Sequence, residues 1–250
     1  MIAITILKVN GGINLITALA HRGYPGKYPE NTLTAYRAAY ELGFSHIEID
    51  VQLSKDGVPI LMHDITVNRM TNAKGFVKDF TFAELRKLKV GGNETIPTLE
   101  EALQFAKGKM NVAVELKQHG YLYPELEEKT LKIIEETGMM DSVYVNSFDH
   151  YSIRKMRELS EEIELGVIQH GATPGLFHFL KEIKASSLAV RIEYLTDEFV
   201  RECEEAGLQI IVWPVDKQWQ FDIFRRYPNI LCTTNKLEDF KKMYKKAQFQ

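Results

Sequence analysis

The sequence has few of the features that mark several large classes of protein. Only two cysteines, Cys203 and Cys232, occur in 250 residues, and neither lies in the paired spacing of a zinc site. We expect both to be buried, reduced thiols. No apolar run approaches the roughly 18 residues needed to cross a bilayer, so we expect no stable membrane insertion. The chain also lacks a low-complexity tract, a charge block and an internal repeat.

The charge balance excludes one class of partner. The chain has 31 Lys and Arg residues against 34 Asp and Glu residues, a formal net charge of −3. This balance gives no electrostatic basis for binding nucleic acid, and we expect no such partner. An anionic substrate would need a local basic group or a metal ion.

The N-terminal segment raises the question of a signal peptide. Ala18-Leu19-Ala20 looks like a small-residue cleavage site. The upstream segment, however, has no basic leader and is interrupted by polar and glycine residues, and cleavage there would remove most of a predicted strand. We therefore expect a cytoplasmic protein. Residues 1–14 could form an extra strand, a barrel plug or a loose arm.

Short β-rich runs alternate with amphipathic helical runs along the whole chain, which is typical of a parallel sheet with crossover helices. The predicted strands are 15–21, 46–53, 111–117, 142–148, 164–169, 187–192, 209–215 and 230–234. The predicted helices are 31–42, 99–107, 123–137, 151–160, 174–183, 196–206, 219–226 and 237–247. Eight β/α units in about 250 residues match the size of a TIM (β/α)8 barrel, so we expect residues 1–250 to form one such domain.

Residues 54–97 do not fit the β/α repeat. They hold a returning strand at 58–63, polar and turn-rich residues 66–74, a short helix near 82–89 and a Gly-Gly-Asn loop. We interpret them as a small insertion between the second strand and its helix. An insertion there would lie over the carboxyl end of the strand, where the active sites of barrels lie.

The stretch 46–64 predicts a hairpin that carries charged side chains. Glu48 and Asp50 are two residues apart, so on a strand both side chains leave the same face. The expected cross-strand pairs are Leu53 with Val58, Val51 with Ile60, Asp50 with Leu61 and Glu48 with His63. Taken alone, the stretch also fits an edge hairpin whose charges face water.

Polar residues collect where the predicted strands end, at the carboxyl face of the barrel. They are His21, Arg22, Glu48, Asp50, Glu115, Lys117, Asn146, Trp213 and Asp216, with His63 and Asp64 added by the hairpin. The carboxylates of Glu48, Asp50 and Glu115 form a hard oxygen site suited to Mg²⁺ or Ca²⁺ rather than to zinc. Flanking histidines and basic groups suggest a phosphate ester as the substrate.

In order and spacing, seven motifs resemble the glycerophosphodiester phosphodiesterase family. They are His21-Arg22-Gly23, Pro29-Glu30-Asn31-Thr32, Glu48-x-Asp50-Val51, Lys55-Asp56-Gly57, His63-Asp64, Glu115-x-Lys117 and Ser147-Phe148. The resemblance covers the chain from about residue 17 onward. It implies a TIM barrel with a small insertion after strand two.

The resemblance also implies roles for particular residues. One divalent cation, Mg²⁺ or Ca²⁺, would be bound by Glu48, Asp50 and Glu115. His21 and His63 would be the acid/base pair. Arg22 and Lys117 would bind the phosphate, Trp213 would line the pocket near the glycerol or head group, and Glu30 would support the site from behind.

Two segments depart from the family pattern. Gly43-Phe44-Ser45 replaces the usual Gly-Ala-Asp before strand two, which we interpret as a packing change. The last strand reads Thr233-Thr234-Asn235 in place of the common Thr-Asp, and we assign no function to it.

The implied reaction is hydrolysis of glycerophosphodiesters to sn-glycerol 3-phosphate and an alcohol. One histidine would remove a proton from the glycerol hydroxyl for in-line attack, the other would protonate the departing alcohol, and water would open the cyclic phosphate. The sequence leaves open which histidine acts first and whether water attacks directly. The head-group specificity and the oligomeric state cannot be deduced from it.

Three alternatives remain. A relative could act on lipid-linked diesters as a lysophospholipase D. A barrel that has lost activity could bind phosphate without turnover. An unrelated barrel with a solvated acidic rim would bind no metal at the three carboxylates.

Overall fold

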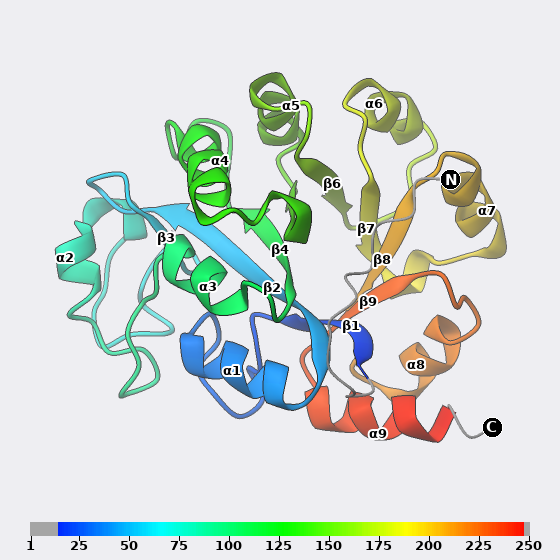
Figure 1. Ribbon diagram of the computed structural model, residues 1–250, viewed down its shortest axis with the longest axis horizontal. Helices are drawn as coiled ribbons and strands as arrows, with labels where there is room; N and C mark the ends of the chain where they lie inside the picture. The colour runs from blue at the N-terminus through cyan, green and yellow to red at the C-terminus, as the bar shows by residue number, and fades with distance from the viewer. Residues whose placement is uncertain (1–14, 248–250) are drawn as a thin grey trace.

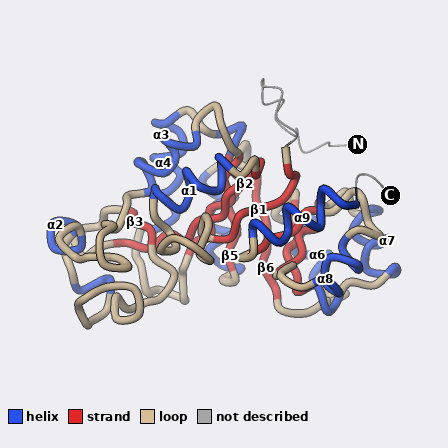
Figure 2. The backbone as a smooth tube through the Cα atoms, turned by 90° about the horizontal axis from the view of Figure 1, so that it is seen from below, coloured by secondary structure: helices blue, strands red, loops and turns tan. Residues whose placement is uncertain are grey.

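The computed structural model describes residues 15–247. The alternatives considered for residues 1–14 therefore lie outside the described residues. Within that range the chain forms a closed barrel of parallel strands surrounded by helices (Figure 1). Seen from below, the strands occupy the middle and the helices lie around them (Figure 2). The predicted TIM (β/α)8 barrel is confirmed.

Eight parallel strands close the barrel. They are β1 (Ile16–His21), β2 (Phe44–Leu53), β4 (Asn111–Leu116), β5 (Val143–Ser147), β6 (Glu164–Gln169), β7 (Ser187–Arg191), β8 (Gln209–Trp213) and β9 (Leu231–Thr234). Each pairs with the next in this order, and β1 pairs with both β2 and β9, which closes the sheet. Most predicted strands differ from these by one or two residues at an end: β2 begins two residues earlier than predicted, for example, and β8 ends two residues earlier.

Helices and short 3-10 turns connect the strands. They are α1 (Leu33–Glu41), α3 (Leu99–Ala106), α4 (Leu126–Thr137), η2 (Met140–Ser142), α5 (His150–Leu159), α6 (Leu176–Glu182), η3 (Ile192–Tyr194), α7 (Asp197–Glu205), α8 (Gln218–Phe224) and α9 (Leu237–Ala247). Thr32 caps α1 and Thr98 caps α3, each by accepting a hydrogen bond from a backbone N–H three residues on. Gly138 ends α4 with φ +63°, a conformation that favours glycine.

Apolar side chains fill two layers because neighbouring residues of a strand face opposite sides. The larger layer lies between the outer face of the barrel and the helices, and it includes Ile47, Ile49 and Phe240. A smaller cluster is made of Leu19, Ala113, Ile168, Ala189, Ile211 and Leu231. Burial of one large apolar side chain contributes about 1.5–3 kcal/mol, so these layers hold the strand ends in fixed relative positions.

Residues 54–97 lie between β2 and α3 and form the flank at the left of Figure 1. They contain β3 (Pro59–Leu61), η1 (Val77–Asp79) and α2 (Phe82–Leu85). The segment has its own apolar cluster of Ile60, Met62, Val67, Val77, Leu85, Val90 and Ile96. Because β3 runs antiparallel to β2, it returns the chain toward the barrel end where β2 carries its carboxylates.

The predicted hairpin register is wrong by one residue. Val51 lies opposite Leu61 and Leu53 opposite Pro59, whereas Leu53 was expected opposite Val58. Val58 lies opposite Ser54 rather than opposite Leu53: Ser54 N–H donates to the Val58 carbonyl at 3.0 Å, and Val58 N–H donates to Ser54 Oγ at 2.9 Å. Gly57, at φ +76°, then completes a three-residue connection.

The register also removes the expected pairing of Glu48 with His63. Strand β3 ends at Leu61, so His63 lies beyond the ladder and is not a cross-strand neighbour of Glu48. It reaches the carboxyl end of the barrel from the bend that follows β3.

Candidate active site

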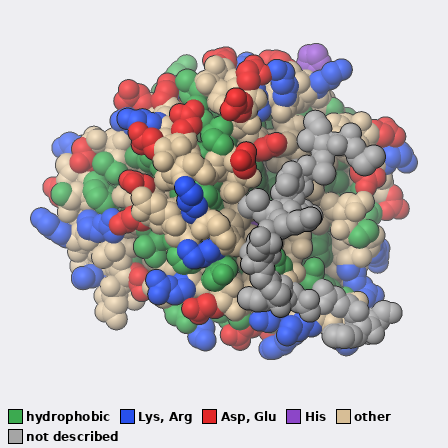
Figure 3. All heavy atoms as spheres, in the orientation of Figure 1, with side chains coloured by type: hydrophobic (Ala, Val, Ile, Leu, Met, Phe, Trp, Pro, Cys, Tyr) green, Lys and Arg blue, Asp and Glu red, His purple; other side chains and the backbone are tan. Residues whose placement is uncertain are grey.

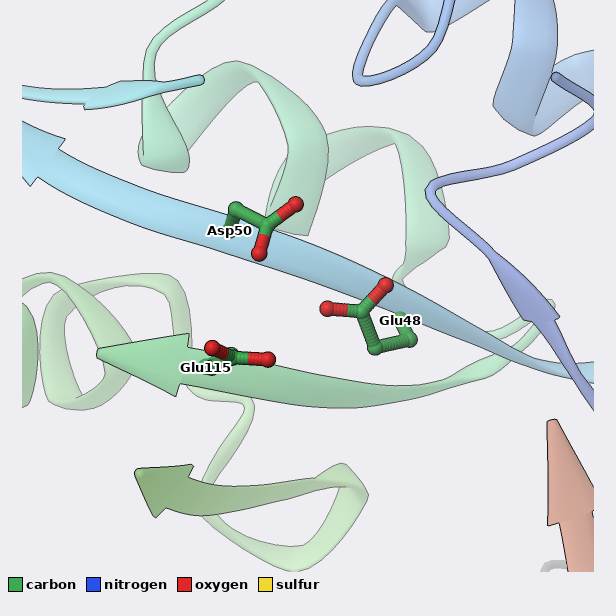
Figure 4. A group of neighbouring side chains, drawn as sticks. All are labelled: Glu48, Asp50 and Glu115. Carbon is green, nitrogen blue, oxygen red and sulfur yellow. The ribbon is translucent and has the colours of Figure 1, made fainter. Parts of the chain in front are cut away.

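Three carboxylates lie side by side at the carboxyl ends of adjacent strands. In the parallel ladders, His21 of β1 is level with Glu48 of β2, and Asp50 of β2 is level with Glu115 of β4. One oxygen from each of the three acidic side chains lies within 4.8 Å of the others. Figure 4 shows the three side chains gathered over β2 and β4. The two-residue spacing in the sequence thus produces a cluster in space.

The cluster is buried and incompletely hydrogen-bonded. The relative exposures of Glu48, Asp50 and Glu115 are 5%, 0% and 8%. Glu48 Oε1 and Asp50 Oδ1 are buried without a hydrogen-bond partner. Because buried oxygens without a hydrogen bond are costly, these two atoms are candidate ligands for a cation.

Two basic side chains compensate part of this charge. Lys117 Nζ lies 2.6 Å from Glu115 Oε1 and 3.6 Å from Asp50 Oδ1, and Arg22 Nε lies 3.2 Å from Asp50 Oδ2. Two cations against three carboxylates leave one negative charge unbalanced. A divalent cation on the free oxygens would reverse the sign of the site and leave it suited to a singly charged phosphodiester. The donor set therefore fits a hard divalent ion.

The pKa values of the carboxyl groups follow the same imbalance. Burial, together with the charges of Asp50 and Glu115, raises the pKa of Glu48 well above its ordinary value. Burial also acts to raise the pKa of Asp50, but Arg22 and Lys117 outweigh it and lower that pKa. The pKa of Glu115 is raised by burial and by Asp50.

A tight reversal after β1 places Arg22. Its φ is +56°, and its backbone N–H donates to Glu48 Oε2 at 3.0 Å. The next residue, Gly23, has φ +86°, and a Cβ atom there would lie 2.7 Å from Ala35 Cβ. Only glycine therefore allows this close approach to α1. The Arg22 guanidinium also donates to Glu30 Oε1 at 3.1 Å.

The His21 imidazole lies between the acidic cluster and the end of β9. Nδ1 lies 2.6 Å from Asn235 Oδ1, and Nε2 lies 3.8 Å from Glu48 Oε2. Burial and the neighbouring Arg22 charge lower the pKa of His21 to about 4. The side chain is therefore neutral near pH 7 in this environment, with one ring nitrogen able to accept a proton.

His63 is held through its neighbours. Its Nδ1 lies 2.8 Å from Asp64 Oδ1, and Arg69 binds both oxygens of Asp64 and both oxygens of Glu30. Burial lowers the pKa of His63, although the charge of Asp50 opposes this shift. Gln52 adds a backbone clamp, because its Nε2 donates to the carbonyl oxygens on either side of His63.

Asn31 supports the cluster from behind. It lies at φ +54°, a conformation in which asparagine is enriched, and its Nδ2 donates to Asp50 Oδ2 at 2.8 Å. Its Oδ1 in turn accepts a hydrogen bond from Tyr36. In the sequence, Asn31 was singled out only as part of the motif at residues 29–32, and the helix cap there is Thr32.

A pocket of about 500 Å³ opens over this cluster. Of the residues predicted for the site, those that line it are His21, Arg22, Glu48, His63, Glu115 and Trp213. Asp50 and Lys117 lie beneath, in contact with these groups, so all eight predicted residues come together. The opposite wall is aromatic: the Trp213 ring lies 5.8 Å from Phe148 and 5.5 Å from His170.

Four residues of the site were not predicted from the sequence: Asn31, Gln52, His170 and Asn235. His170 follows β6 without a recognisable motif, and its position after a strand end was the one available signal. The other three act through hydrogen bonds to groups distant in the chain. For Asn235 the one signal in the sequence is that Thr234-Asn235 departs from the family's usual Thr-Asp.

The surface agrees with the balanced composition. The face drawn in Figure 3 carries both acidic and basic side chains. Among residues 15–247, no helix has the length and apolar character required to cross a bilayer.

The described residues thus define a TIM barrel with an acidic cluster, basic groups and two histidines at its carboxyl end. Residues 21–239 match the model of the glycerophosphoryl diester phosphodiesterase family. The chain is 38% identical over 208 residues to a glycerophosphodiester phosphodiesterase of Caldanaerobacter subterraneus subsp. tengcongensis, a match covering 80% of this chain and 86% of that relative. It is 41% identical over 175 residues to one of Bacillus altitudinis, covering 66% and 71% of the two chains.

A solved structure shows the same fold. The Oleispira antarctica phosphodiesterase, determined with its product sn-glycerol 3-phosphate, superposes with a TM-score of 0.86 over 92% of this chain and 97% of that one, at 24% identity. The protein therefore belongs to the glycerophosphoryl diester phosphodiesterase family and is a phosphoric diester hydrolase.

Proposed function

We propose that the protein hydrolyses small glycerophosphodiesters, such as glycerophosphocholine or glycerophosphoethanolamine, to sn-glycerol 3-phosphate and an alcohol. The observation that carries this proposal is the buried trio Glu48, Asp50 and Glu115 beside Arg22 and Lys117 under one pocket. Membership of the family supports the substrate class. A cytoplasmic location remains a prediction from the sequence.

The three carboxylates would hold one divalent cation, Mg²⁺ or Ca²⁺. When bound, the cation would supply charge that polarises a phosphoryl oxygen and lowers the pKa of a nearby hydroxyl. The two unpartnered oxygens of Glu48 and Asp50 favour this role. Oxygen ligands without sulfur or imidazole favour hard ions over zinc.

Arg22 and Lys117 would bind the phosphate. Both are already anchored to acidic residues, so their charged groups are oriented before the substrate arrives. Preorganised donors of this kind stabilise negative charge as it develops in the transition state. On the far wall, Trp213 would contact the glycerol or the head group.

The two histidines would move protons. His21 ends β1, whereas His63 follows β3, so the rings reach the same pocket from different elements. One ring would accept the proton of the attacking hydroxyl and the other would donate a proton to the departing alcohol. The roles would exchange when water opens the cyclic phosphate.

Release of glycerol 3-phosphate from the small diesters, and of choline from lysophosphatidylcholine, tests the proposal. Glycerophosphocholine, glycerophosphoethanolamine and lysophosphatidylcholine should be assayed with Mg²⁺, with Ca²⁺ and after chelation. We expect turnover of the small diesters, loss on chelation and recovery when a cation is restored. Faster turnover of lysophosphatidylcholine would favour a lysophospholipase D. Tight binding without turnover would identify a non-catalytic barrel and overturn the proposal.

Two variants test the histidines. His21→Ala and His63→Ala should each lower kcat by about 10²–10⁴-fold, the range of a lost acid or base, while calorimetry still detects the cation. His178→Ala is the matched control because His178 is exposed on α6. Near-normal turnover in either site variant, with cation bound, would contradict the two-histidine scheme.

A further inference from the structure

We propose that Asn235, itself oriented by Asp216, is a positioning residue that fixes the tautomer of His21. The inference rests on the proposed proton-transfer role of His21 and adds two residues to it. Asn235 follows β9 and Asp216 follows β8, so both lie at the carboxyl end of the barrel, beside β1. Asn235 lies 214 residues along the chain from His21.

Asp216 holds Asn235 at two points. Asp216 Oδ1 accepts from the backbone N–H of Asn235 at 2.7 Å, and its Oδ2 accepts from Asn235 Nδ2 at 2.8 Å. Thr234 Oγ1 donates to Oδ1 at 3.0 Å, and Gln220 Oε1 accepts from the backbone N–H of Asp216 at 2.9 Å. The carboxylate therefore has a fixed position from which it accepts both hydrogen bonds from Asn235.

The hydrogen bond to Asp216 Oδ2 determines the orientation of the Asn235 side-chain amide. A carboxylate accepts hydrogen bonds and does not donate them, so the NH₂ group must face Asp216. The reversed amide would place a carbonyl oxygen about as close to a carboxylate oxygen, which is repulsive. Asn235 Oδ1 therefore faces His21, as the 2.6 Å contact with Nδ1 requires. The hydrogen-bond network settles the orientation of the amide on chemical grounds.

The orientation of the amide then decides the tautomer of His21. Because Oδ1 of an amide can only accept, the His21 proton must lie on Nδ1. In the neutral ring, Nε2 is then left with a free lone pair. Nε2 is also the ring nitrogen that lies 3.8 Å from Glu48 Oε2, toward the acidic cluster. The chain Asp216–Asn235–His21 thus presents the accepting nitrogen to the place where a substrate hydroxyl would bind.

An amide fits this position better than a carboxylate would. An Asp at position 235 would place its oxygen beside Asp216 Oδ2, where Asn235 Nδ2 now lies at 2.8 Å. Two carboxylates at that distance repel or must share a proton. The neutral amide avoids this repulsion. It donates from Nδ2 to Asp216 and accepts at Oδ1 from His21.

The tautomer can be measured directly. The full chain, selectively labelled with ¹⁵N-histidine, would give long-range ¹H–¹⁵N correlations for its 7 histidines, and His21→Ala would assign the His21 signals. Spectra would be recorded with Mg²⁺ and after chelation. We expect wild-type His21 to show the Nδ1–H tautomer with an unprotonated Nε2. A proton on Nε2 of His21 in the wild-type protein would overturn the inference.

Variants test the two added residues. Asn235→Ala removes the acceptor and Asp216→Asn removes the group that orients it, so both should shift His21 toward a mixture of tautomers. Each should lower kcat by about 10–100-fold, part of the contribution of one acid or base, with KM changed less than about threefold. Asn229→Ala is the matched control because this asparagine is exposed.

The outcomes separate the two proposals. A changed tautomer together with a lower kcat supports the inference. An unchanged tautomer in Asn235→Ala, with a folded protein by circular dichroism, overturns it. If the tautomer changes as expected but the wild-type protein hydrolyses no glycerophosphodiester, the proposed function fails and the hydrogen-bond assignment stands.

Discussion

The Tyr123 hydroxyl donates a 2.5 Å hydrogen bond to Oε1 of Gln52. Because the oxygen of the Gln52 amide is engaged there, its Nε2 faces the carbonyl oxygens of Met62 and Asp64, at 2.5 and 2.8 Å. His63 lies between these two residues. A fully buried amide on β2 therefore fixes the backbone that carries His63, in place of the strand pairing expected from the sequence.

Removing the Tyr123 hydroxyl should loosen this clamp. Tyr123→Phe leaves Gln52 Oε1 buried without a donor, which costs about 1–3 kcal/mol of unfolding free energy. We expect kcat for glycerol 3-phosphate release to fall several-fold while KM changes little. Denaturant unfolding and steady-state kinetics measure the two effects. Tyr151→Phe is the control because Tyr151 is 81% exposed. Lost stability with an unchanged kcat would show that the clamp does not serve His63.

Cation binding should stabilise the folded protein. Glu48, Asp50 and Glu115 come together only in the native barrel, so a divalent ion binds the folded state preferentially. At a free concentration of 100 times Kd, such an ion adds about 2.7 kcal/mol to the unfolding free energy. We expect Mg²⁺ or Ca²⁺ to raise the Tm in a concentration-dependent manner.

Asp50→Asn should abolish this stabilisation, since it removes a ligand charge at nearly constant shape. The control is Glu205→Gln, which changes an exposed carboxylate at the end of α7. A wild-type Tm that is insensitive to both cations would contradict the assignment of the metal site.

Variants of Arg69 separate its effect on the stability of the fold from its effect on the position of Asp64 and His63. Its side chain is 47% exposed, and its guanidinium bridges Asp64 and Glu30. Surface ion pairs contribute about 0–1 kcal/mol, and the paired bonds of Arg69 to two carboxylates place Arg69→Ala near the upper end of that range, about 1 kcal/mol of unfolding free energy. It should nevertheless lower kcat, because Asp64 then loses the group that aligns it with His63. Arg69→Lys should be intermediate, since lysine cannot form two paired bonds.

The control for Arg69 is Arg225→Ala, which removes another exposed arginine near an aspartate. Equal kcat values for Arg69→Ala and Arg225→Ala would show that the bridge has no part in catalysis.

The positions of the carboxylates could be predicted because they depend on strand periodicity. Residues two apart on one strand have side chains on the same face of the sheet, and the carboxyl ends of parallel strands meet at one end of the barrel. Glu48, Asp50 and Glu115 needed only these rules. The barrel itself followed from the repeated alternation of strand and helix patterns.

The supporting residues could not be predicted because they depend on side-chain contacts between distant segments. Asn235 meets His21 across 214 positions, and Gln52 meets Tyr123 across 71. The hairpin register failed for a local reason: Ser54 Oγ accepts from Val58 N–H, so Val58 lies opposite Ser54 instead of opposite Leu53. That hydrogen bond cannot be predicted from the hydrophobic pattern of the sequence.

The two cysteines should resist modification in the folded protein. Burial raises the pKa of Cys203 to about 12, and burial with the nearby Asp216 charge raises the pKa of Cys232 well above its ordinary value. A thiolate is the reactive form, so iodoacetamide near pH 8 should label neither thiol in the native state and both in concentrated guanidinium chloride.

The raised pKa of Cys203 also makes the stability of the folded protein depend on pH. Between the ordinary thiol pKa of 9.0 and about 12, folded Cys203 keeps a proton that the unfolded chain releases, so this thiol makes stability fall as pH rises. Cys203→Ala should flatten the fall, and rapid native labelling would contradict the burial of both thiols.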